Sequence, residues 1–106
     1  MTKVDFFIKD NRFIGFSCSG HSGYDVEGYD IVCASVSTAV QFVANYLMKY
    51  HSSQILLEVD DKNCKITLRS NCLFKECHMQ ISILEDFAKD LKEQYPEYFT
   101  FDYLEV

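Results

Sequence analysis

Apolar and polar residues alternate in five segments of this chain, a pattern typical of half-buried strands. The apolar positions that share a face are Val4, Phe6 and Ile8; Ile14, Phe16 and Cys18; Ile55, Leu57 and Val59; Ile66 and Leu68; and Phe99, Phe101 and Tyr103. Turn residues at 10–11 and 60–63 separate the first pair of segments and the second pair. Each pair therefore predicts a β-hairpin.

Two other segments repeat apolar residues every three to four positions, as one face of a helix does. The first stripe, in a helix of about 20 residues starting at Ile31, is Val32, Val36, Ala39, Val40, Val43, Leu47 and Tyr50. The second stripe is Phe74, Cys77, Ile81, Leu84, Phe87, Leu91 and Tyr95. We expect Asp30 to cap the first helix and Ser70 or Asn71 to cap the second, which Pro96 ends.

The element order is thus ββαββαβ. It predicts an α+β fold in which two helices pack on one mostly antiparallel sheet of five strands. At 106 residues the chain is long enough for one domain, and no linker interrupts it, so we expect a single domain over residues 1–106.

The charge balance narrows the choice of partners. Acidic residues outnumber basic ones 16 to 10, for a net charge of −6. This argues against direct nucleic-acid binding and suits a basic protein or peptide. No apolar run approaches the roughly 18 residues of a transmembrane helix, so we expect no membrane span and a cytoplasmic location. The five cysteines should then be reduced thiols.

A glycine-rich loop at residues 20–29 connects the second strand to the first helix and brings together the residues suited to chemistry. If Asp30 is the N-cap, Cys33 is the third helical residue, where the helix dipole favours a thiolate. His21, at the start of the loop, is placed to take the thiol proton and later protonate a leaving amine. The alternative is that Cys33 is a buried structural residue and His21 a solvated loop residue.

Several supporting roles around this pair stay open. Asp30 either caps its own helix or orients His21 as a third catalytic member, and its position favours the cap. Backbone amides of Cys33 and its neighbours in the first turn are candidates for stabilising an oxyanion. The loop residues Ser22, Gly23 and Gly28 are expected to close over bound substrate.

The other cysteines give weaker signals. Zinc binding is conceivable at a Cys-x2-His pair, Cys18 and His21, and at a cluster of Cys72, Cys77 and His78. Structural zinc usually uses tight ligand pairs, and Cys18 and Cys77 lie on apolar faces, so we expect both in the core. Cys64 and Cys72 receive no role. We expect neither a metal nor a cofactor.

Two stretches carry a family resemblance. Gly20-His21-Ser22-Gly23-Tyr24 and Gly28-Tyr29-Asp30-Ile31-Val32-Cys33-Ala34-Ser35-Val36-Ser37 closely resemble the signature of the bacterial ribosomal-processing cysteine protease (Prp) family. The length and the element order fit this family too. By resemblance, its nucleophile falls on Cys33, its catalytic histidine on His21 and its acidic position on Asp30.

The resemblance implies a homodimeric cysteine endopeptidase with a Cys/His dyad. Such enzymes remove a short N-terminal extension from large-subunit ribosomal protein twenty-seven, cutting after an aromatic residue, during ribosome assembly. The expected partner is therefore the extended ribosomal precursor. A non-enzymatic, ribosome-associated protein-binding module is the alternative, in which Cys33 and His21 are structural.

Overall fold

The computed structural model describes residues 1–21, 23–26, 30–70 and 74–106. Its elements are β1 (Thr2–Lys9), β2 (Arg12–Ser19), α1 (Ile31–His51), the short 3-10 helix η1 (Ser52–Gln54), β3 (Ile55–Asp60), β4 (Lys65–Ser70), α2 (Lys75–Gln94) and β5 (Phe99–Glu105). The predicted ββαββαβ order and the α+β class are confirmed.

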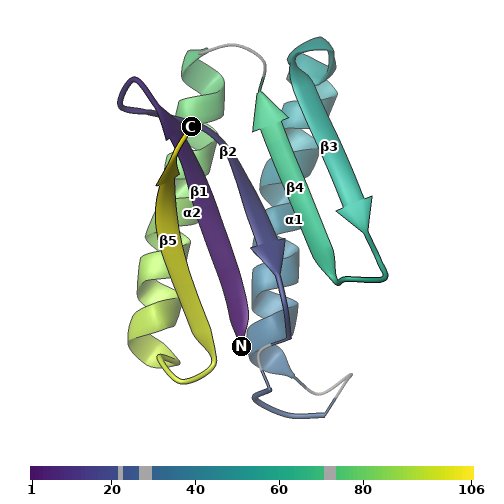
Figure 1. The fold of residues 1–106 in the computed structure, drawn as a ribbon, viewed down its shortest axis with the longest axis vertical. Coiled ribbons are helices and arrows are strands. Elements are labelled where there is room, and N and C mark those ends of the chain that lie inside the picture. The colour runs from purple at the N-terminus through teal and green to yellow at the C-terminus, as the bar shows by residue number, and fades with distance from the viewer. Residues whose placement is uncertain (22, 27–29, 71–73) are drawn as a thin grey trace.

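The five strands form one sheet in the order β3-β4-β2-β1-β5. Neighbouring strands are antiparallel except β1 and β5, which are parallel. Both helices lie on the same face of this sheet (Figure 1). Their apolar stripes meet the inward residues of the strands, and the fully buried centre includes Phe6, Phe16, Leu47, Ile81 and Phe99. The layers are therefore one sheet and one pair of helices.

The helical stripes predicted from the sequence are largely buried, with two corrections. Tyr50, expected on the apolar face of α1, is 61% exposed at the end of the helix. The expected cap of α2 at Ser70 or Asn71 is wrong for Ser70, which still belongs to β4, and Asn71 lies outside the described residues. Phe74 occupies the N-cap position, and within the described chain its side chain makes no capping bond.

A β-bulge changes the inward face of β2. The β1–β2 register shifts between Phe7 and Ile8, so that Phe7 pairs with Gly15 and Ile8 pairs with Phe13. Ile14 is the extra residue and stays half-exposed, whereas Phe13 is buried in the core. Strict alternation places Ile14 on the core face, and that prediction is wrong because alternation assumes an uninterrupted ladder.

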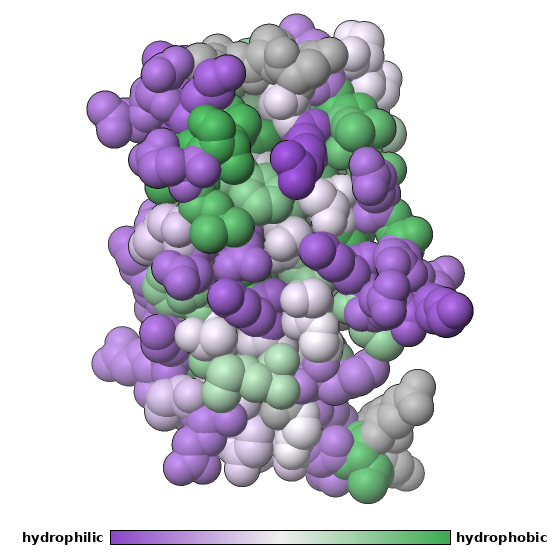
Figure 2. Space-filling model, viewed as in Figure 1, coloured by the Kyte–Doolittle hydropathy of each residue, from purple (hydrophilic) through white to green (hydrophobic). Residues whose placement is uncertain are grey.

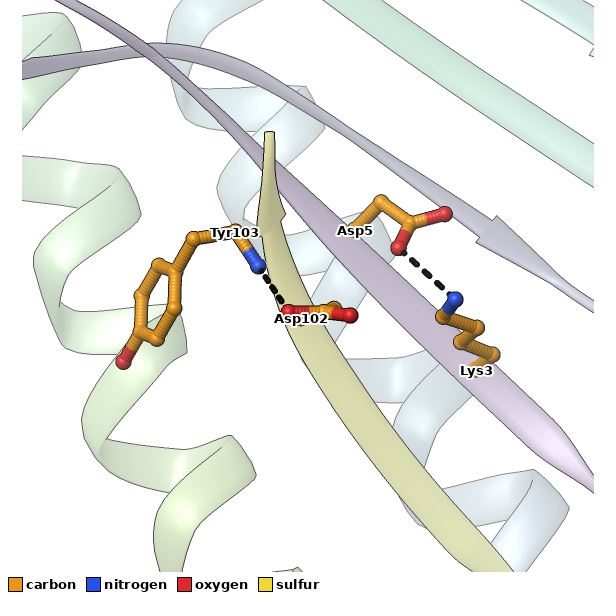
Figure 3. Close-up of polar contacts among 4 residues, drawn as sticks. All are labelled: Lys3, Asp5, Asp102 and Tyr103. Atoms are coloured by element: carbon orange, nitrogen blue, oxygen red, sulfur yellow. Dashed lines mark hydrogen bonds and ion pairs between the residues drawn. The ribbon is translucent and has the colours of Figure 1, made fainter. Parts of the chain in front are cut away.

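The sheet face opposite the helices is largely polar. Figure 2, which views the molecule from this side, shows hydrophilic side chains over much of it, with separate apolar patches between them. Lys3 and Asp5 on β1 form an ion pair (Nζ–Oδ1 3.4 Å), and Asp102 is the partner of Asp5 on β5 (Figure 3). Tyr103 points the other way, toward α2, where its hydroxyl donates to Glu85. Neighbouring residues on β5 thus serve opposite faces.

One segment departs from our expectation that no apolar run is long enough to span a membrane. Residues 31–54, α1 with η1, pass that test by length and composition. In this fold Val32, Val36, Val40 and Leu47 of the helix are buried in the core. The core packing accounts for the apolar character of this face.

Candidate active site

The end of β2 directs His21 out of the sheet. Gly20, the residue between them, has φ +86°, a backbone conformation that side chains disfavour. A Cβ at Gly20 would lie 2.5 Å from the backbone oxygen of Met1, so only glycine fits this close approach. The turn at Gly20 leaves His21 exposed at the edge where α1 begins.

Asp30 holds the first turn of α1, which carries Cys33. Its Oδ1 accepts a hydrogen bond from the Cys33 amide (2.9 Å), so the predicted N-cap is confirmed. Its Oδ2 accepts from the amide of Tyr24 (3.2 Å), which ties the loop to the helix. Both carboxylate oxygens are thus engaged with backbone amides, which favours the capping role of Asp30 over orientation of His21.

The described part of the loop is anchored by aromatic packing. The ring of Tyr24 packs edge-on against Tyr95 and Tyr98, with centroid distances of 5.4 and 5.2 Å. Gly23 has φ +74° and is exposed. Ser22 and Gly28 lie outside the described residues, so the gating role of this loop stays a prediction.

His21 and Cys33 line two pockets together. The first, here called the strand pocket, has a volume of about 300 Å³ and is lined by both residues together with Cys18, Val59, Cys64 and Ile66. The second, the loop pocket, has a volume of about 480 Å³ and is lined by both residues together with Gly23, Asp25, Asp30 and Ala34. Cys33 is half-buried and His21 is exposed, so the cysteine lies deeper in the shared pockets than the histidine.

The contact that the His21 ring makes is with a different cysteine. Its Nε2 lies 3.1 Å from Sγ of Cys64, and among the described residues this is the one hydrogen bond of the ring. No hydrogen bond joins His21 to the Cys33 thiol in that part of the chain. The structure therefore gathers two thiols, not one, around the histidine.

Strand pairing explains why Cys64 reaches this site. In the antiparallel β2–β4 ladder, Ser19 is the partner of Lys65. Continuing that register by one residue puts Cys64 opposite Gly20, next to His21. Sequence reasoning missed Cys64 because its turn looks like a solvated hairpin connection. The signal lies in the pairing of β2 with β4, which no local pattern reveals.

The third thiol of the strand pocket, Cys18, is held in the protonated form. Burial first, and the nearby Cys33 second, raise its pKa from 9.0 to about 12. Cys18 is half-buried against the core and Cys77 is fully buried in it, as expected. Within residues 1–21, 23–26, 30–70 and 74–106, no group of three or more His, Cys, Asp or Glu side chains is arranged to hold a metal ion.

Comparison with protein families shows to which family the chain belongs. Residues 1–100 match the family described as cysteine protease Prp. The chain belongs to this family. It is therefore a cysteine protease, as the resemblance of the loop and helix start implied.

Solved structures share the Prp fold at low sequence identity. The S. aureus ribosomal processing protease Prp, in complex with a covalently linked product peptide, is 23% identical, with a TM-score of 0.88 and coverage of 98% of this chain and 100% of that one. The same S. aureus protease with a substrate peptide gives a TM-score of 0.79 at 20% identity, covering 98% of this chain and all of that one. SMU.848 from Streptococcus mutans gives 0.79 at 21%, covering 100% and 96%. A search of curated proteins found no match.

Proposed function

We propose that this Prp-family protease removes the short N-terminal extension of large-subunit ribosomal protein twenty-seven, cutting after an aromatic residue. The observation that carries the proposal is that His21 and Cys33 line the same two pockets, in a chain of a cysteine protease family. Its substrate class is supported by the S. aureus relative, a ribosomal processing protease crystallised with substrate and product peptides.

In the proposed mechanism, His21 takes the proton of the Cys33 thiol and the thiolate attacks the scissile carbonyl carbon. The carbon–sulfur bond forms, the carbon–nitrogen bond breaks, and His21 returns the proton to the departing amine. Water, deprotonated by His21, then attacks the thioester. This step releases the extension peptide as a carboxylate and restores the Cys33 thiol.

Oxyanion stabilisation is expected from the amides of Cys33 and its neighbours in the first turn of α1, and the hydrogen bonds of that turn indicate which of these amides are available. The Cys33 amide donates to the Asp30 carboxylate, and the Ala34 amide donates to the Asp30 carbonyl oxygen (3.0 Å). Ile31 and Val32 are the first two residues of α1, so their amides have no carbonyl acceptor within the helix. We assign oxyanion stabilisation to these two amides, which share the positive end of the helix dipole with Cys33.

Acidic side chains around the site suit a basic ribosomal substrate. Asp60 and Asp61 line the strand pocket, and Asp25 lines the loop pocket. The pKa of Asp60 is lowered, chiefly by the hydrogen bond from the Asn63 side chain, so its carboxylate is ionised at neutral pH. Negative charges at both pockets favour the approach of a positively charged peptide.

We also propose that the enzyme is a cytoplasmic homodimer. An apolar groove of about 640 Å³ lies between α1 and α2 and is lined by Ile31, Phe42 and Ile83 among others. Phe42 is 74% exposed, which is costly for a large aromatic ring unless another surface covers it. A second copy covering this groove would bury all three. The Phe42→Glu variant should then sediment as a monomer where the wild type sediments as a dimer.

The deciding experiment is intact-mass analysis of an extended ribosomal precursor incubated with the wild type and with Cys33→Ala. Loss of the extension with wild type alone supports the proposal. Cleavage by both proteins contradicts the assignment of Cys33. Absence of cleavage by either, with binding to the precursor retained, favours the non-enzymatic binding module.

A further inference from the structure

We propose that Cys64 is a resolving thiol, which captures Cys33 as a reversible Cys33–Cys64 disulfide after a hydroperoxide has oxidised Cys33. The inference rests on the proposed function in one respect, because it takes Cys33 to be the reactive thiol. It starts from the two thiols that line the strand pocket with His21.

The position of Cys64 suits a mobile thiol. It sits in the β3–β4 turn with φ +49°, a strained conformation for a residue other than glycine, and it is exposed. Its amide makes a long bond of 3.4 Å to the Asp61 carbonyl, and its thiol a loose contact of 3.9 Å to the same oxygen. Cys64 thus lies outside the paired residues of β3 and β4, so a change in the conformation of its turn need not break the strand ladder.

The thiol of Cys64 also has a proton acceptor beside it. Its Sγ lies 3.1 Å from Nε2 of His21, so the imidazole can accept the thiol proton and leave a nucleophilic thiolate. His21 thus has a second proton donor besides Cys33 within the same pocket.

Cys18, the other thiol of the strand pocket, fits this role poorly. Its pKa of about 12 keeps it protonated at neutral pH. It also lies inside β2, paired with Val4 on one side and Ile66 on the other, so the ladder holds its backbone in place. Cys64 lies in the β3–β4 turn, outside the paired residues of both strands.

The chemistry balances with a hydroperoxide as oxidant. The Cys33 sulfur attacks the peroxide oxygen, the O–O bond breaks, and Cys33 becomes a sulfenic acid while the peroxide leaves as water or an alcohol. His21 takes the Cys64 proton, and the Cys64 thiolate attacks the Cys33 sulfur. The S–S bond forms as the S–O bond breaks, and the departing hydroxide takes the proton from His21 to become water. A dithiol reductant restores both thiols.

The consequence is protection of Cys33. A sulfenic acid that meets no thiol proceeds to sulfinic acid, which dithiols do not reverse. Capture by Cys64 stops oxidation at a reversible stage.

The test treats the whole protein with hydrogen peroxide and follows its mass without substrate. The wild type should lose about 2 Da, and non-reducing peptide mapping should place the link between Cys33 and Cys64. Cys64→Ser should instead gain about 32 Da on Cys33 as sulfinic acid, which dithiothreitol does not remove. The exposed turn position lets this variant fold, and circular dichroism checks that it does.

Other results overturn the proposal. These are a Cys18–Cys33 link, sulfinic acid in the wild type as fast as in Cys64→Ser, or a wild type whose mass does not change. The Cys18→Ala variant is the matched control and should still form the Cys33–Cys64 link. Because the readout is mass alone, failure of the disulfide is separate from failure of precursor cleavage by untreated wild type.

Discussion

The two helices of this protein each carry a cysteine at the third helical position, yet the two thiols have opposite surroundings. Asp30 precedes α1 and Cys33 follows three residues later; Phe74 precedes α2 and Cys77 follows at the same spacing. Cys33 is half-buried and lines two pockets with His21. Cys77 is 0% exposed inside the core. Helix position alone therefore does not make a cysteine a catalytic candidate.

The difference comes from what each helix start faces. The start of α1 meets the open end of the sheet, where β2 ends and the β3–β4 turn brings in Cys64 (Figure 1). Each helix start also has a histidine nearby. His21 points a ring nitrogen at a thiol, whereas Nδ1 of His78 accepts the amide of Phe13 (3.0 Å) in a structural bond. The same residue types thus line a pocket at the start of α1 and pack in the core at the start of α2.

Removing each thiol tests this comparison most strongly. Cys33→Ala should lower the rate of precursor cleavage by at least about a thousandfold, because the proposed nucleophile is lost. Cys77→Ala should keep cleavage and lower the free energy of unfolding by about 1–2 kcal/mol through a small cavity. Cleavage assays and denaturant unfolding measure the two effects. Equal loss of cleavage in both variants would break the comparison.

The two histidines give the next largest contrast. His21→Ala should reduce the cleavage rate by about a hundredfold or more, with the unfolding free energy nearly unchanged, because the ring is exposed. His78→Ala should leave the rate per folded molecule near wild type. It should cost about 1–3 kcal/mol of stability, since the Phe13 amide loses its acceptor and the Phe13 ring loses a stacking partner. A reversed outcome would place the chemistry at α2.

The rate of thiol alkylation also distinguishes the two helix starts. The more accessible thiols should react about tenfold or more faster than the buried ones. With iodoacetamide at mildly acidic pH, Cys33 and Cys64, which line the strand pocket with His21, should be alkylated first, and Cys18 and Cys77 last. Cys18 reacts slowly because its pKa of about 12 leaves almost no thiolate. Peptide mapping by mass spectrometry against time gives the order of alkylation, and early labelling of Cys77 would contradict it.

The raised pKa of Cys18 also affects stability. The thiol of the unfolded chain loses its proton from about pH 9, whereas the folded thiol keeps its proton up to about pH 12. The free energy of unfolding should therefore fall as the pH rises from about 9 to 12.

The smallest expected effect is that of the N-cap side chain. Asp30 caps α1 with a hydrogen bond, whereas Phe74 at the start of α2 does not. Asp30→Ala should cost about 1 kcal/mol in unfolding free energy, because the Cys33 amide loses its acceptor. Asp30→Asn should recover most of that stability, since its side-chain oxygen still accepts the bond. If Asn restores stability and cleavage together, Asp30 acts as a cap; if it restores stability alone, the carboxylate charge also contributes to catalysis.

Local features were the most predictable part of the site. The 3.6-residue period of α1 and the acceptor at Asp30 are properties of neighbouring residues, so they suffice to place Cys33 in the first turn of the helix. The glycines of residues 20–29 predicted a loop after the second strand, and Gly20 at its start has a positive φ of +86°. These predictions depend on hydrogen bonds and side-chain spacing within a few residues.

What only the tertiary structure decided is the set of contacts between segments far apart in the chain. By itself the sequence determined the element order, the two helical stripes and the position of Cys33 behind its cap. The β-bulge that buries Phe13 instead of Ile14, and the placement of Cys64 against His21, follow from strand register and from the pairing of β2 with β4. Register and strand order are set by the packing of the whole sheet against both helices, and residues 43 positions apart carry no local pattern that shows they will meet.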